Sequence, residues 1–220
     1  LVGGVETLFK DSSDIVQRYA ENAYKTAGLS ANAYMETVTS FSASLLQSLD
    51  GDTAAAASAA DMAISDMSDN GNKMGTSMES IQNAYQGFAK QNYTMLDNLK
   101  LGYGGTKTEM ERLITDAEGL NSAFKATRDE NGNLAMSFAD IVQAIHIVQD
   151  DMGITGTTAR EAGETISGSL GSLSAAWQNL VTGFSNPDAD LGALIGNVVS
   201  SAETALGNLL PVVVQAMSGI

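Results

Sequence analysis

The chain has 220 residues, of which 44% are hydrophobic, and its formal net charge is -15. It contains no cysteine, which excludes disulfides and thiol chemistry, and its acidity argues against binding nucleic-acid phosphates, which need clustered Lys and Arg. Only two prolines occur, so long helices are permitted, and aromatic residues are scarce, which predicts a core built mainly from Ala, Leu, Ile, Val and Met.

Two capped helices are predicted near the N-terminus. A helix can begin at Ser12 or Ser13 and end at Gly28, because Ser is a favoured N-cap and Gly a favoured C-terminal residue. Ser30 can cap the next helix, which carries apolar residues on one face and stops at Asp50.

An alanine-rich helix follows. Asp52 can cap it, and the pair Asn70-Gly71 is predicted to end or interrupt it. The spacing Thr76-x-x-Glu79 is a capping box, which predicts the start of another helix.

A flexible loop is predicted over residues 102–105, which read Gly-Tyr-Gly-Gly. It faintly resembles a phosphate-binding loop, but no hydrophobic strand precedes it and Thr106 interrupts the Gly-Lys pair. Thr106-x-x-Glu109 is a second capping box and predicts a further helix.

Residues 125–138 do not follow a helical pattern. Asn131-Gly132 lies between two short extended candidates, and Asn-Gly favours a hairpin because both residues tolerate positive φ. A calcium loop is excluded, since counting from Asp129 places the glycine at position 4 instead of position 6. We therefore expect a small β-hairpin here.

Helices resume after this segment. Ser137 or Asp140 can cap one that ends before Gly153. A third capping box, Thr158-x-x-Glu161, predicts a helix that runs on to about residue 183.

A boundary is predicted at Asn186-Pro187-Asp188, because proline disfavours helix in the residue before it. Residues 191–220 carry a single charge, Glu203, and are dominated by small and apolar side chains. Proline and polar residues make this run marginal as a membrane helix, so a partner-packing or core helix is favoured over a membrane-active one.

Together these signals predict an all-α fold of Gly-punctuated helices with one small β-hairpin near residues 125–138. Three regions are expected. They are a helical region over 1–124, a hairpin plus two helices over 125–185, and an apolar helical segment over 186–220 that leads into further chain.

No catalytic set emerges from the sequence. His146 is the only histidine, and the positions three and four residues after it hold Gln149 and Asp150. Asp150 is placed to orient the imidazole, but no nucleophile accompanies the pair. We expect no enzymatic activity, no cofactor and no metal.

Interaction residues are predicted instead. Trp177 is the only tryptophan and shares a helical stripe with Leu173 and Leu180, which predicts a buried anchor or an interface hot spot. Met74 and Met78 belong to a methionine cluster typical of adaptable packing surfaces.

Three sequence blocks cover most of residues 9–181. They are FKDSSDIVQRYAENAYKTAGLSANAYMETVTSFSASLLQSLDGD, YQGFAKQNYTMLDNLKLGYGGTKTEMERLI and FADIVQAIHIVQDDMGITGTTAREAGETISGSLGSLSAAWQNLV. The pieces GTTAREA and AAWQNL are the most specific. With these blocks, the chain resembles the core region of tail tape-measure proteins from tailed phages and prophages of Gram-positive bacteria.

The resemblance implies a structural scaffold whose length sets the length of the tail and which leaves the tail during DNA ejection. It implies three partners, namely the tail tube protein, tail-assembly chaperones and other tape-measure copies. It also implies contact with the host membrane on ejection and no specific nucleic acid. The expected location is the lumen of the virion tail, after assembly in the host bacterial cytoplasm.

Two alternatives stay open at this point. One is a helical partner-binding module of another injection or secretion assembly, which would share the acidic, cysteine-free composition of this sequence. The other is a membrane-active protein that acts through residues 188–220.

Overall fold

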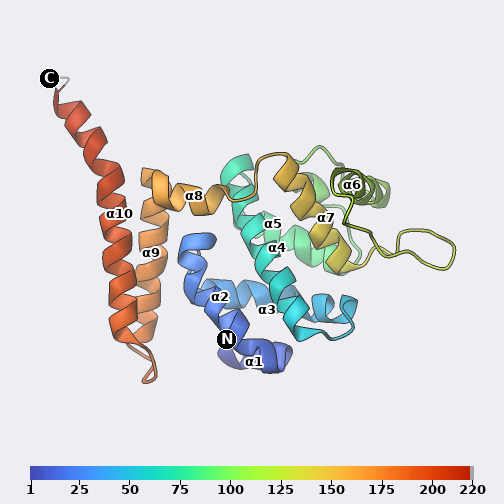
Figure 1. Ribbon diagram of the computed structural model, residues 1–220, viewed down its shortest axis with the longest axis horizontal. Coiled ribbons are helices and arrows are strands. Elements are labelled where there is room, and N and C mark those ends of the chain that lie inside the picture. The colour runs from blue at the N-terminus through green and yellow to red at the C-terminus, as the bar shows by residue number, and fades with distance from the viewer. Residues whose placement is uncertain (219–220) are drawn as a thin grey trace. The chain divides into compact units, whose positions relative to one another are not determined.

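The computed structural model describes residues 1–218 and is helical almost throughout (Figure 1). The α-helices are α1 (Val2–Phe9), α2 (Ser13–Thr26), α3 (Ala31–Ser48), α4 (Thr53–Met74), α5 (Met78–Ala89), α6 (Lys107–Leu120), α7 (Phe138–Asp151), α8 (Thr157–Glu164), α9 (Ile166–Gly183) and α10 (Leu191–Ser218). Two short 3₁₀ helices are η1 (Lys10–Ser12) and η2 (Leu96–Leu99). The predicted all-α class is confirmed.

The chain divides into two compact units. The first unit comprises Leu1–Gln17 and Met35–Gly156, and the second comprises Arg18–Tyr34 and Thr157–Ile220, so the divisions fall inside α2 and α3 and between α7 and α8. These division points differ from the boundaries of the three regions that the sequence predicted.

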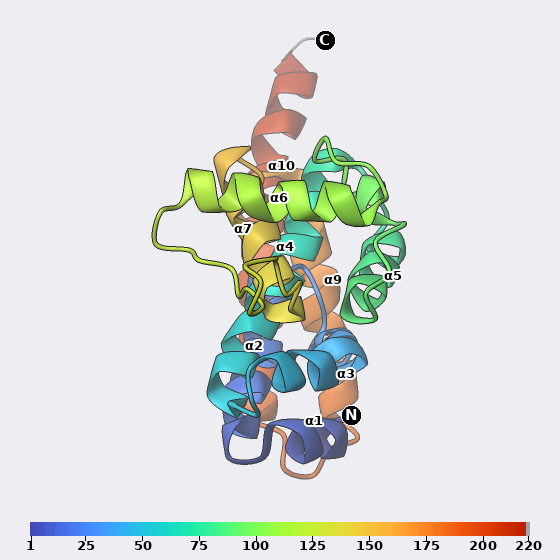
Figure 2. The same cartoon turned by 90° about the vertical axis from the view of Figure 1, so that its right-hand side faces the viewer.

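The first unit is built around α4. Its alanine-rich face is buried, and α1, α5 and α7 pack against it. Figure 2 shows α6 lying across α7 within this unit. Small side chains let these helices approach closely, and larger ones fill the remaining space.

A few aromatic side chains are packed into the core of the first unit. Phe41 and Phe138 meet edge to face with ring centroids 6.0 Å apart, and Tyr85 lies 5.7 Å from Phe88. All four are buried. The expectation of a mainly aliphatic core is confirmed, because Ala, Val, Ile, Leu and Met make up most of the buried hydrophobic residues of this unit and the aromatic side chains are a minority among them.

The second unit contains an antiparallel pair of helices, α9 and α10, joined by the turn at residues 184–190. The N-terminal end of α9 packs against α8. The break between α8 and α9 was not predicted, since the capping box at Thr158 suggested one helix to residue 183. Thr165 ends α8 and caps α9, its hydroxyl accepting the N–H of Gly168 at 3.0 Å.

Several predicted helix ends are confirmed by cap hydrogen bonds. Asp52 accepts the N–H of Ala55, and Thr106 accepts the N–H of Glu109. Ser137 caps α7, and Gly28 and Gly153 adopt positive φ where helices end.

Two other predicted ends are wrong. The helix α4 continues through Asn70-Gly71 to Met74, because the amide of Asn70 is engaged by distant groups instead of by its own backbone. The cap of α5 is Ser77, whereas the hydroxyl of Thr76 donates to the carbonyl of Asn98.

The predicted hairpin over 125–138 is also wrong. Among residues 1–218 the segment has no strand, only one isolated antiparallel bridge between Arg128 and Leu134. The carboxylate of Asp129 accepts the backbone N–H groups of Asn131 and Asn133, and this holds the turn. Pairing stops at once because Met136 has a φ of 57°.

The apolar segment after Pro187 forms α10, a helix of 28 residues that continues through Pro211. Asn208 donates to the carbonyls of Gly163 and Thr165 and so attaches this helix to the corner between α8 and α9. Figure 1 shows the last turns of α10 extending beyond the end of α9.

Candidate functional site

A buried polar cluster lies between α4 and α7 in the first unit. The Nδ1 atom of His146 is 3.0 Å from both carboxylate oxygens of Asp66, which is 1% exposed. The sequence pointed to Asp150 as the group that orients this histidine. That interpretation is wrong, because the hydrogen-bonding carboxylate comes from a residue 80 positions away in the chain.

Burial changes the acidity of this pair. Loss of water around Asp66 raises its pKa to about 6, although the hydrogen bond from His146 works against the increase. The hydrogen bond to Asp66 raises the pKa of His146 in turn, and the nearby carboxylates of Asp150 and Asp69 add to that increase. Both groups therefore hold protons to higher pH than they would in water.

The cluster continues through two side-chain amides. The Nε2 of Gln149 donates to the backbone carbonyl of Asp66, and the Nδ2 of Asn70 donates to Gln149 and to the carbonyl of Leu99 at 2.8 Å each. The carboxylate of Asp69 accepts the N–H of Gly156 at 2.7 Å. These contacts connect α4 to α7, to η2 and to the segment that follows α7.

The arrangement favours a structural role for the cluster. Its hydrogen bonds join helices to one another, and no hydroxyl group donates to His146 among the contacts within residues 1–218. In the same part of the chain, no three His, Cys, Asp or Glu side chains are grouped so that they could hold a metal ion. A signal for Asp66 does exist in the sequence, since it lies on the same helical face as the buried Ala63 and Ala56.

The loop at residues 102–105 is organised by an acidic side chain. Glu109 accepts the N–H of Gly104 at 2.9 Å, and Arg112 donates to Glu109 and to the carbonyl of Gly102. The hydrogen bond from Arg112 is the main reason that the pKa of Glu109 is lowered to about 2. The carboxylate of Glu109 thus already takes the loop N–H and the Arg112 guanidinium that a phosphate would need, which disfavours phosphate binding.

The predicted interaction residues fall in both units. Met74 and Met78 are half-buried in the first unit, at the end of α4 and the start of α5. Leu173, Trp177 and Leu180 lie on α9 in the second unit.

The three residues on α9 differ in exposure. Leu180 is buried, Leu173 is half-buried, and Trp177 is 55% exposed. A buried anchor within the chain is therefore the wrong interpretation of Trp177. Its alternative role, as a residue that meets a partner, stays a prediction.

The side of α9 that faces the rest of the second unit carries small residues. Ala175 and Ala176 are buried with Tyr24, and Val198 of α10 packs against them. The side-chain carbonyl of Asn179 accepts the N–H of Ala31 at 2.8 Å. With this side and Leu180 packed inside the second unit, the side chains of Leu170, Trp177 and Val181 are left exposed on its outer surface.

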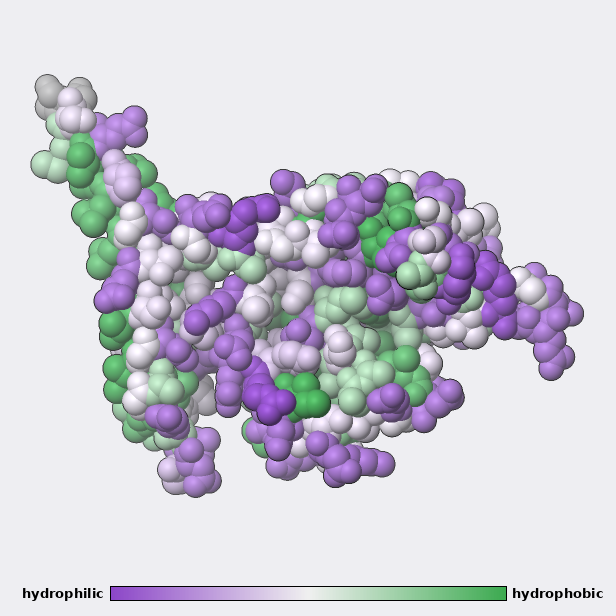
Figure 3. Space-filling model, viewed as in Figure 1, coloured by the Kyte–Doolittle hydropathy of each residue, from purple (hydrophilic) through white to green (hydrophobic). Residues whose placement is uncertain are grey.

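An apolar surface runs along both helices of the pair, and we call it the α9–α10 face. On α9 and the residue that caps its C-terminal end it includes the exposed side chains of Leu170, Trp177, Val181 and Phe184. On α10 it includes those of Leu191, Ile195, Val199, Leu206, Leu210 and Val213. Figure 3 shows hydrophobic atoms following α10 along most of its visible length. The sequence identified this segment as apolar but could not tell which residues would stay exposed.

Within the described part of the chain, none of the helices is both long and apolar enough to cross a membrane. Comparisons with known protein families, with curated proteins and with solved structures find no match to this chain.

Proposed function

We propose that this protein is a structural subunit of an assembly, and that the assembly is a phage tail whose length the protein sets. The α9–α10 face carries the first part of the proposal, because an apolar surface of this extent is typical of chains that meet other proteins. The narrower assignment to a tape measure is supported by the resemblance of the three sequence blocks.

The role is non-enzymatic and needs no cofactor. The acid–base pair of His146 with the buried Asp66 forms hydrogen bonds that join helices. A chain that is packed into a tube and later threaded out would be helical, free of cross-links and separable into short segments. The helices here, which end at glycines such as Gly28, Gly75 and Gly153, and the absence of cysteine fit that requirement.

In this proposal the partners are the tail tube protein, tail-assembly chaperones and other copies of the chain, with host membrane contact during ejection. The protein would be made in the host cytoplasm and would then lie in the tail lumen. The net charge of -15 fits protein partners better than DNA.

The proposal is tested by changing the length of the chain in the phage that encodes it. We expect deletion of residues 9–181 to shorten the tail by up to about 260 Å, the span of those residues as continuous α-helix at 1.5 Å per residue. A tandem duplication of the same residues is the matched variant and should lengthen the tail. Tail lengths are measured by electron microscopy. Unchanged length in particles that contain the altered protein would refute the proposal.

A second candidate is a helical partner-binding module of another injection or secretion assembly. The α9–α10 face favours it equally, since the face indicates a partner without naming one. The length experiment separates the two candidates, because a binding module would affect assembly without scaling the tail.

A membrane-active role for residues 188–220 is the third candidate. It predicts leakage of vesicles by the intact chain and none after removal of those residues. Leakage that survives the removal would exclude the segment as the cause.

A further inference from the structure

The α9–α10 face forms a continuous surface, because exposed apolar residues recur along one stripe of each helix. On α10 the face residues Ile195, Val199, Leu206 and Val213, together with the half-buried Ala202 and the exposed Leu209 between them, follow one another in alternating steps of four and three. This spacing keeps them on one side of a helix and is the spacing by which helices pack together in bundles.

The two stripes lie on the same side of the helix pair. In α9, Ala176 and Gly183 face α10, and in α10, Val198 and Leu194 face α9. Successive residues of an α-helix are rotated by about 100° around its axis, because each turn has 3.6 residues. In each helix the exposed stripe begins one residue after those that face the other helix, so it lies about 100° from the contact side. Because the helices are antiparallel, equal rotations in the same sense bring both stripes to one surface.

The area of this face suffices for a stable interface. A half-exposed large apolar side chain presents on the order of 100 Å². The face has several such residues on each helix, Phe184 at 66% and Leu206 at 57% exposure among them. Together they approach or exceed the roughly 800 Å² that each partner buries in a standard interface.

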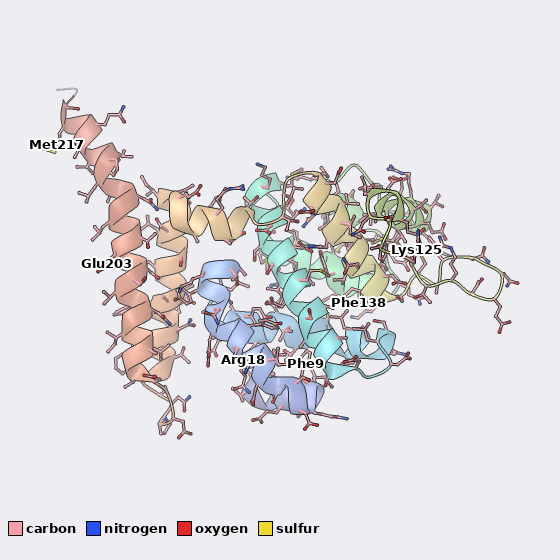
Figure 4. All side chains as sticks on the ribbon, in the orientation of Figure 1. Phe9, Arg18, Lys125, Phe138, Glu203 and Met217 are labelled. Atoms are coloured by element: carbon pink, nitrogen blue, oxygen red, sulfur yellow. The ribbon has the colours of Figure 1, made fainter. Side chains whose placement is uncertain are left out.

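Charge indicates what covers the face. The protein as a whole is strongly acidic, so two copies repel each other except where charges are missing. Such a place exists on α9 and α10, since α9 has no charged residue and α10 has only Glu203 within residues 191–218. Figure 4 shows Glu203 midway along α10 and Met217 near its free end.

A lipid surface fits the face less well than a second copy does. Helices that lie on membranes carry Lys or Arg on their polar side, where they meet anionic headgroups. No Lys or Arg occurs after Arg160 in this chain. The polar side of α10 presents Ser200, Thr204 and Ser218 instead.

We propose that the α9–α10 face is a homodimer interface, in which the helix pairs of two copies form a four-helix bundle. Each copy supplies the same surface, as two-fold symmetry requires. The end of α10, exposed from Leu209 onward and extending past α9, then packs against the second copy. The inference deepens the proposed function by giving the surface through which copies meet, but it rests on this face alone and holds for any function of the chain.

The test is sedimentation of the purified 220-residue chain over a range of concentrations. We expect a dimer, and we expect Leu206→Glu to weaken association at least tenfold, because it places a charge in the centre of the bundle. Ser200→Glu is the matched control, since it adds the same charge on the exposed polar side of α10 and should leave the dimer intact. Circular dichroism of both variants confirms that the helices remain, as expected for substitutions at exposed positions.

Trp177 supplies a second measurement, because it is the only tryptophan and is exposed in the single chain. Its emission should shift to the blue as concentration rises, in step with dimer formation, and the shift should be absent in Leu206→Glu. A chain that stays monomeric to about 0.1 mM, far above a micromolar Kd, overturns the proposal, as does a dimer that Leu206→Glu leaves unchanged. A monomer that pellets with phosphatidylglycerol vesicles would overturn it in favour of a lipid partner. Tail length is scored separately, so failure here leaves the length experiment unaffected.

Discussion

At the residue scale, the pairing of His146 with Asp66 determines how the first unit responds to pH. Both pKa values are raised in the folded protein, that of Asp66 to about 6. A raised folded pKa means that the folded state binds more protons than the unfolded chain. The stabilisation that each group provides is therefore complete below its pKa in the unfolded chain, about pH 4 for Asp66 and about pH 6.5 for His146. It is lost as pH rises through the pKa that the group has in the folded protein.

We accordingly expect the free energy of unfolding to fall as pH rises from about 5 through the titration of Asp66 and then of His146. Glu109 and Glu118, whose pKa values are lowered to about 2, stay ionised throughout this range and do not contribute to the change. Asp66→Asn should reduce the pH dependence, because it removes the buried carboxyl group and the partner of His146. Urea unfolding at several pH values measures the effect.

The control for that experiment is Asp11→Asn, which removes the same charge at an exposed position. It should keep the pH dependence of the original chain. If the two variants respond to pH in the same way, the buried pair is not the source of the dependence.

At the scale of elements, the corner between α8 and α9 depends on the absence of a side chain at Gly168. A Cβ atom there would collide with the backbone carbonyl of Glu161, which cannot move aside without shifting α8. Thr165 forms the corner by capping α9 at the N–H of the same glycine. The corner ends one helix and starts the next, so it sets where α9 begins.

Gly168→Ala should destabilise the second unit by about 1–3 kcal/mol, the usual cost of forcing an extra carbon into a packed site. Gly171→Ala is one turn further along α9, where an added Cβ meets nothing within 4 Å. It should instead stabilise by up to about 1 kcal/mol through helix propensity. Thermal unfolding compares the two, and equal midpoints would show that the corner tolerates a side chain.

Local signals predicted most helix starts and missed those elements that distant residues determine. Asp52, Thr106 and Ser137 cap helices by hydrogen bonds to nearby N–H groups, so the neighbouring sequence was sufficient to find them. The amide of Asn70 bonds to Leu99 and Gln149, and these contacts keep α4 helical beyond the predicted end. Nothing near Asn70 in the sequence indicates either partner.

At the scale of the whole molecule, net charge opposes folding and assembly. The chain carries 26 acidic residues against 11 basic ones, and ion pairs such as Arg128–Glu118 neutralise only a small share of them. Repulsion among the remaining carboxylates is long-ranged at low salt and is screened within about 8 Å at 0.15 M ionic strength.

Raising NaCl from roughly 10 mM to 150 mM, which shortens the screening length from about 30 Å to 8 Å, should therefore raise the unfolding midpoint. Each kcal/mol gained corresponds to about 2–4 °C for a chain of this size. Differential scanning calorimetry measures the midpoint, and an equal osmolality of glycerol controls for effects other than screening. A midpoint that stays constant or falls would mean that attractive pairs outweigh the general repulsion.

The candidate interaction residues show the same limit of sequence reasoning. The pattern placed Leu173, Trp177 and Leu180 on one stripe of a helix, and all three do lie on α9. Their burial differs because the side of α9 that is packed inside the unit carries Ala175, Ala176 and Leu180, whereas Trp177 is exposed. A hydrophobic stripe shows that a surface is apolar, but not whether the chain itself covers it.

The sequence by itself determined the helical class, the capped starts of several helices, the boundary at Pro187 and the apolar character of the segment after it. These features depend on contacts within a few residues, on composition or on helical periodicity. Only the tertiary structure decided that Asp66 pairs with His146, that α8 and α9 are separate helices, and that Trp177 lies outside. Those outcomes depend on which surfaces pack together, and in a chain with many small side chains several pairings satisfy the same local pattern.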